Sequence, residues 1–128
     1  MDRKWYEINN NVDVTDVYLF NDIGTFGVSA QSFVEEIKEY EGKELAIHIN
    51  SLGGEVFDGM AIYSIIQRRK AKTIVYIEGI AASIASVIAL AADEVIMSEN
   101  SLLMIHNAWG GTQGDASEMR KQADVLDK

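Results

Sequence analysis

The chain has 128 residues, of which 48% are hydrophobic and 24% are charged, a composition typical of a globular protein with a core of its own. The sequence has no cysteine and only two histidines, which excludes disulfides and a cysteine nucleophile and disfavours a zinc site; we expect no metal and no cofactor. Twenty acidic against eleven basic side chains give a formal net charge of −9, which disfavours nucleic acids and anionic membrane surfaces as partners.

Targeting and membrane signals are weak in this sequence. The first ten residues contain no apolar segment typical of a signal peptide. The longest apolar run, residues 80–92, is rich in alanine and serine and too short to span a bilayer. No linker or repeat interrupts the chain, so we expect a cytoplasmic protein with a single domain over residues 1–128.

The first half of the sequence alternates predicted strands and helices. Residues 13–20 are rich in β-forming residues and predict a strand. Ser29 is the predicted N-cap of a helix that runs to about Tyr40. Residues 44–50 predict a second strand with His48 on one face and the aliphatic side chains on the other. A helix to about Lys70 follows, and its predicted core face consists of Phe57, Met60, Ala61 and Ile65.

The second half continues this alternation. Residues 73–78 predict a strand that ends at Gly79, and a helix over residues 81–92 follows. Strands are predicted at 94–98 and 102–106, and then a Gly-rich segment leads into a final helix that is capped by Asp115 and Glu118. The alternation predicts an α/β fold with a parallel sheet, in which functional loops gather at the carboxyl ends of the strands. Three segments follow such ends: residues 51–54, 79–83 and 106–111.

Ser83 is a candidate nucleophile. A strand ends just before it, small residues allow a tight turn, and a helix begins, so its hydroxyl could lie beside free backbone N–H groups that stabilise an oxyanion. Two alternatives remain open at this point. Ser83 could serve only as a helix cap, and Ser86, one turn later, is a rival nucleophile.

His106 and the glycine pair complete the candidate site. His106 follows an apolar strand, a position that suits a general base near neutral pH, although a purely structural histidine is the alternative. His48 lies in mid-strand, and we expect a structural role for it. Gly53 and Gly54 permit a close approach of the backbone to a ligand, but the nearby acidic side chains would repel a phosphate more strongly than a single transient oxyanion.

Four segments together resemble the proteolytic subunit of the Clp protease family, most closely its phage and prophage head-maturation branch. They read INSLGG at 49–54, GMAIY at 59–63, GIAASIAS at 79–86 and MIHN at 104–107. They follow the family order with near-family spacing, and the resemblance extends from about residue 17 to the end of the chain. It implies the ββα spiral of the Clp and crotonase-like fold, with a mainly parallel sheet.

The resemblance also implies an activity and a set of site residues. By position, Ser83 would be the nucleophile of a serine endopeptidase and His106 its base. The backbone N–H groups of Gly54 and Ile84 would form the oxyanion hole. A substrate strand would bind between two backbone edges, one formed by residues 54–56 and the other by the segment around Trp109. The substrate-binding residues would be Gly53, Gly54, Val56 and Trp109.

The family further implies partners for the chain. Its members act on peptides or unfolded proteins and assemble as homo-oligomeric rings. An ATPase commonly feeds these rings, and in the phage branch the substrates would be capsid or scaffold proteins.

Two departures from the family pattern affect the expected activity. Leu52 stands where the family motif has proline, which lowers the rigidity of the loop without removing the oxyanion hole. The family's acidic triad member lies downstream of His106, in a C-terminal part of the domain that residues 1–128 do not contain, since they end within the family's handle helix. Asp115, Glu118 and Asp124 do not match that position, so we expect weak or no peptidase activity from this chain.

Two other classes of function remain as alternatives. A crotonase-like acyl-CoA enzyme would use the same pair of N–H groups to bind a thioester enolate and would need no serine nucleophile. A non-catalytic assembly module would account for the missing acid.

Overall fold

The computed structural model describes residues 14–107 and 109–128 of the chain. Within these residues five segments are strands: β1 (Val14–Leu19), β2 (Glu44–Ser51), β3 (Thr73–Ala82), β4 (Glu94–Met97) and β5 (Leu102–Met104). The helical segments are α1 (Ala30–Ile37), the 3-10 helix η2 (Lys38–Tyr40), α2 (Val56–Arg68), α3 (Ile84–Ala89) and α4 (Ala116–Asp127).

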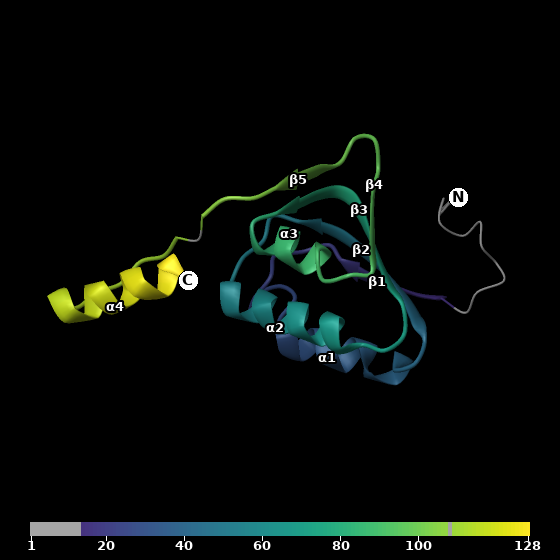
Figure 1. The fold of residues 1–128 in the computed structure, drawn as a ribbon, viewed down its shortest axis with the longest axis horizontal. Coiled ribbons are helices and arrows are strands. Elements are labelled where there is room, and N and C mark those ends of the chain that lie inside the picture. Colours follow the sequence, from purple (N-terminus) through teal and green to yellow (C-terminus); the bar gives the residue numbers. More distant parts are fainter. Residues whose placement is uncertain (1–13, 108) are drawn as a thin grey trace.

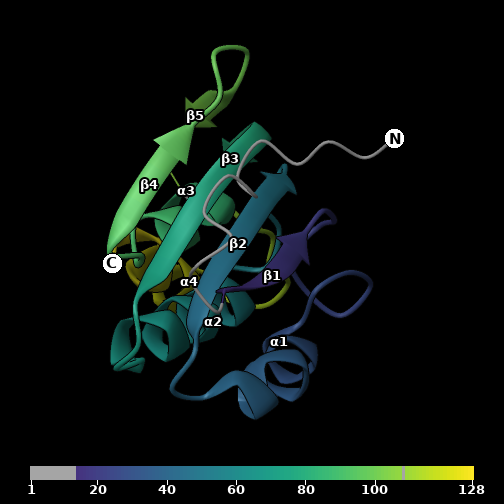
Figure 2. The ribbon, with the colours of Figure 1, turned by 90° about the vertical axis from the view of Figure 1, so that its right-hand side faces the viewer.

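The strands form one parallel sheet in the order β1-β2-β3-β4, and β5 also pairs with β3. β4 and β5 follow one another along the same edge of β3, because β4 pairs with residues 74–77 and β5 with residues 80–82. Figure 2 shows the sheet from the side that α1, α2 and α3 do not cover. The predicted α/β fold with a mainly parallel sheet is confirmed.

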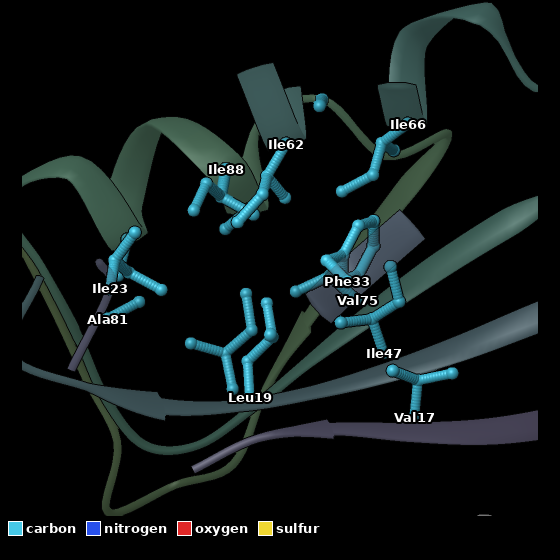
Figure 3. Packing of buried hydrophobic residues seen from close by; sticks show 14 of the residues in the cluster. Val17, Leu19, Ile23, Phe33, Ile47, Ile62, Ile66, Val75, Ala81 and Ile88 are labelled. Atoms are coloured by element: carbon cyan, nitrogen blue, oxygen red, sulfur yellow. The ribbon is translucent and has the colours of Figure 1, made fainter. Parts of the chain in front are cut away.

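Helices α1, α2 and α3 cover one face of the sheet and build the core against it (Figure 1). In Figure 3 the branched side chains of the strands point toward those of the helices. The fully buried members include Leu19, Phe33, Ile47, Ile62, Val75 and Ile88. Among the described residues, no helix has the length and hydropathy needed to cross a membrane.

The predicted core face of α2 is wrong at its N-terminal end. Phe57 is 77% exposed and Met60 is 49% exposed, whereas Ile62 is 0% exposed. Gly59 is buried, and a Cβ atom at this residue would lie 2.1 Å from Cγ1 of Ile84. The helix therefore turns its smallest residue toward α3, a preference that counting apolar residues cannot detect.

The boundary between β3 and α3 also differs from the prediction. The strand continues through Gly79 to Ala82, and the helix begins only at Ile84. The reason is tertiary, because β5 pairs with the second half of β3 and extends the strand past the glycine. Ser83 is consequently the residue that separates strand from helix, and it is not part of the first helical turn.

Helix α4 follows an extended segment after β5 and lies apart from the sheet and the other helices (Figure 1). The side chain of Asp115 accepts a hydrogen bond from the Glu118 N–H at 3.0 Å, which confirms the predicted N-cap. None of the residues of α4 is buried.

Candidate active site

A cleft of about 610 Å³ opens at the carboxyl ends of β1, β2 and β3. Six of the seven predicted site residues line it together: Gly53, Gly54, Val56, Ser83, His106 and Trp109. Ile84, the seventh, directly follows Ser83 as the first residue of α3 and is buried. The loop of residues 22–27 after β1, together with Leu52 and Glu55, lines the cleft as well and was not predicted.

Ser83 has an unusual backbone conformation. Its φ of 57° and ψ of −129° make it the one residue other than glycine with a positive φ among the described residues. L side chains rarely adopt this region, and occupying it costs of order 1–3 kcal/mol. The Ser83 N–H donates to the Met104 carbonyl oxygen at 2.9 Å, which ties the turn to β5.

Ser86 differs from Ser83 in its surroundings. It is 0% exposed, and its hydroxyl donates to the Ser83 carbonyl oxygen at 2.5 Å. It does not line the cleft. The Ser86 hydroxyl thus stabilises the turn from its buried side, whereas Ser83 lines the cleft.

The glycine pair packs against the serine turn. Gly53 has a φ of +97°, and a Cβ atom there would lie 2.7 Å from both the Ala82 carbonyl oxygen and the Ser83 Cβ. The same position is 3.3 Å from the backbone nitrogen of Ile84. Because real side chains essentially never approach so closely, only glycine lets the β2 loop lie directly against the serine turn.

The N–H and carbonyl groups of Gly54 take no part in the backbone bridge between Ile23 and the loop after β2. Ile23 donates to the Gly53 carbonyl oxygen and accepts from the Glu55 N–H, each at 2.9 Å. This bridge uses the two residues that flank Gly54 and leaves out its own N–H and carbonyl. Gly54 therefore lines the cleft with backbone groups that are not part of this pairing.

His106 lies two residues beyond the end of β5 and is exposed to the cleft. Its Nδ1 lies 2.7 Å from the Asn107 carbonyl oxygen. A carbonyl oxygen only accepts, so Nδ1 carries a proton and Nε2 is the ring nitrogen that can act as a base. No hydrogen bond joins Ser83 to His106 within the described residues, and in unliganded sites such bonds are often long before substrate binds.

His48 lies on the other face of the sheet and does not line the cleft. It is fully buried between the rings of Tyr18 and Tyr76, its register partners on β1 and β3, at centroid distances of 4.7 and 5.2 Å. Its ring nitrogens lie 3.0 Å from Asp16 and 3.1 Å from Glu78. These contacts span three strands and fit the structural role expected for His48.

Two carboxyl groups at the start of α2 influence the electrostatics of the cleft. Glu55, which lines the cleft, has a raised pKa, chiefly because its protonated carboxyl donates a hydrogen bond to the Asp58 carboxylate. The Ala30 N–H donates to Asp58 at 2.9 Å and is the main cause that lowers the pKa of that carboxyl. Negative charge at this helix start opposes a phosphate-bearing ligand such as coenzyme A.

Metal ligation finds no support in the described ranges 14–107 and 109–128. No three histidine, aspartate or glutamate side chains gather there in an arrangement that could hold a metal ion.

Comparison with known proteins matches residues 21–128 to the Clp protease family. The ATP-dependent Clp protease proteolytic subunit 2 of Synechococcus sp. is 36% identical over 101 residues, which cover 77% of this chain and 51% of that protein. The ATP-dependent Clp protease proteolytic subunit of Bacteroides thetaiotaomicron is 38% identical over 89 residues, which cover 68% of this chain and 40% of that protein.

The chain belongs to the Clp protease family, as its sequence predicted. It spans about half the length, or less, of the curated relatives that it matches.

Proposed function

We propose that this chain carries the nucleophile, the base and the oxyanion hole of a serine endopeptidase. The observation that carries the proposal is the strained turn at Ser83, which faces one cleft together with His106 and packs against Gly53. A positive φ at a serine lowers stability, and strained residues of this kind cluster at active sites.

In the proposed reaction, Ser83 Oγ attacks the carbonyl carbon of the scissile peptide bond and His106 Nε2 takes the hydroxyl proton. The tetrahedral intermediate collapses with cleavage of the C–N bond, and the same proton passes to the leaving amine. A water molecule then attacks the acyl-enzyme, gives a proton to His106 and releases the acid with Ser83 restored.

The N–H groups of Gly54 and Ile84 stabilise the oxyanion in this proposal. The Gly54 N–H is left out of the bridge to Ile23, and the Ile84 N–H is among the first amides of α3, which have no acceptor within the helix. A Cβ atom at Gly53, the residue before Gly54, would lie 3.3 Å from the Ile84 nitrogen. This closeness supports the Gly54 and Ile84 N–H groups as neighbouring donors.

The substrate would bind as an added strand between residues 54–56 and the segment at Trp109. Gly54, Val56 and Trp109 all line the cleft, which supports this placement of the substrate strand. Main-chain pairing of this kind gives affinity without a narrow sequence preference, which suits unfolded proteins as substrates.

The family suggests further properties that we include in the proposal. The printed names of the relatives describe them as ATP-dependent and as proteolytic subunits. By analogy, this chain would assemble into a ring of identical copies in the cytoplasm and receive substrate from an ATPase. The resemblance of its motifs to the phage branch suggests capsid or scaffold proteins as substrates.

Labelling with a fluorophosphonate probe tests the proposal directly. We expect the wild-type chain to be labelled at Ser83, Ser83→Ala to lose labelling and Ser86→Ala to keep it. A wild-type chain that stays unlabelled at saturating probe, or that is labelled elsewhere, contradicts the proposed nucleophile. Thermal stabilisation by an acyl-CoA would favour the crotonase-like alternative.

A further inference from the structure

The pairing between β2 and β3 contains a bulge just before the candidate site. Ile49 pairs with Ile77, but Ser51 pairs with Ala81, so two steps along β2 correspond to four steps along β3. Three residues of β3 (78–80) therefore lie opposite the single residue Asn50 of β2, two more than a regular ladder would have. Bulges are uncommon between parallel strands and are enriched next to active sites.

Side chains from both neighbouring strands support this bulge. On the β2 side, Asn50 Oδ1 accepts a hydrogen bond from the Ile80 N–H at 3.1 Å. On the β4 side, the Ser98 hydroxyl donates to the Glu78 carbonyl oxygen at 3.2 Å. A Cβ atom at Gly79 would lie 2.4 Å from Asn50 Oδ1, so glycine makes the space that the amide occupies.

The bulge determines which residue of β3 reaches the cleft. Without it, Ser51 would face Gly79, two residues after Ile77, and the serine turn would begin further from the β2 loop. With it, Ser51 faces Ala81 on one side and Ala82 pairs with Met104 of β5 on the other. Gly53 and His106, each two residues beyond those partners, then line the same cleft as Ser83.

We propose that Asn50 is a positioning residue. By accepting the hydrogen bond from the Ile80 N–H, it stabilises the β3 bulge and so holds Ser83 in register with Gly53 and His106. The inference rests on the proposed function, because it concerns the placement of the proposed nucleophile. The Asn50 amide does not line the cleft, so it acts through the backbone of residues 78–80 and not on substrate.

The test compares three variants of the full chain. Asn50→Ala removes the acceptor for the Ile80 N–H, whereas Asn50→Asp keeps an oxygen in that place. Gln67→Ala is the matched control, since it removes an amide side chain that donates to the Ala91 carbonyl oxygen at 3.3 Å, away from the cleft. The measurements are the rate of fluorophosphonate labelling at Ser83, the melting temperature and amide hydrogen exchange at Ser83.

We expect Asn50→Ala to slow labelling by about 10- to 100-fold, because displacements near 1 Å at a reacting group have effects of that size. Exchange of the Ser83 N–H, which donates to Met104, should become faster in the same variant. Asn50→Asp should restore both quantities, and Gln67→Ala should change only the melting temperature.

Two other results separate the inference from the proposed function. Wild-type labelling at Ser83 together with unchanged labelling and exchange in Asn50→Ala overturns the positioning role and leaves the proposed nucleophile intact. Faster Ser83 exchange in Asn50→Ala, in a protein whose wild-type form is never labelled, supports the positioning of the turn and contradicts the proposed nucleophile.

Discussion

The backbone strain at Ser83 is a property of a single residue, and its cost to stability can be measured. Its φ of 57° is one that glycine adopts freely and alanine does not. We expect Ser83→Gly to be more stable than Ser83→Ala by about 1 kcal/mol, the balance between released strain and the greater chain entropy of glycine when unfolded. Urea unfolding of the two variants measures this difference. Equal stability would mean that the turn relaxes in the absence of the hydroxyl.

The carboxyl pair of Glu55 and Asp58 leads to a second prediction at this scale. The contribution of Glu55 to folding stability grows as the pH falls through its raised pKa, whereas that of Asp58 is lost as the pH falls through its lowered pKa, below the ordinary value of 3.8. In an NMR titration, Asp58→Ala should lower the pKa of Glu55 toward its ordinary value of 4.5.

Glu35 provides the internal control for that titration. Its pKa is lowered by a hydrogen bond from Lys38 on another part of the surface, so Asp58→Ala should leave it unchanged. A Glu55 pKa that stays raised in the variant would show that Asp58 is not the cause.

The contact between α2 and α3 depends on one glycine and is a property of the two elements. Alanine favours a helix over glycine by about 1 kcal/mol, but the Gly59 Cβ position lies 2.1 Å from Ile84 Cγ1. We therefore expect Gly59→Ala to lower the free energy of unfolding by about 1–3 kcal/mol through overpacking. Ser64→Ala, on the exposed side of α2, is the control. A Gly59→Ala chain as stable as this control would contradict the packing argument.

Elements whose signals are local could be predicted from the sequence. The cap at Ser29 and the spacing of Phe33 and Ile37 predict α1 from a few neighbouring residues. In the structure Ser29 caps the helix, and Phe33 and Ile37 are its buried residues. The end of β3 and the buried face of α2 were predicted incorrectly because each depends on a distant partner. β5 extends β3, and Ile84 selects Gly59 as the contact.

The same distinction applies to the site. Ser83 and His106 were predicted to lie near one another because parallel sheets gather their functional loops at the carboxyl ends of strands, and both residues line the cleft. The loop of residues 22–27 was missed although the same rule, applied to β1, points to it. The hydrogen bond between Asn50 and Ile80 crosses 30 residues of chain and follows from a register shift that no local pattern encodes.

At the scale of the whole molecule, the orientation of His106 limits the expected rate. Its Nδ1 contacts the carbonyl oxygen of the next residue, and within residues 14–107 and 109–128 it has no hydrogen bond to a carboxylate. Loss of the acid from a catalytic triad typically lowers the rate about ten-thousand-fold. We therefore expect residues 1–128 to hydrolyse fluorogenic peptides slowly but measurably, and Ser83→Ala to abolish this hydrolysis. Turnover typical of a complete triad would contradict the expectation.

The hydrogen bond between the Ser83 N–H and the Met104 carbonyl oxygen has a consequence for biosynthesis. Ser83 is synthesised before Met104 and His106, so the serine turn leaves the ribosome before β5 and the imidazole of His106 do. If Ser83 is the nucleophile, a nascent chain carries an incomplete site and cannot damage itself or its neighbours. Competence to cut would arise only when β5 has paired with β3.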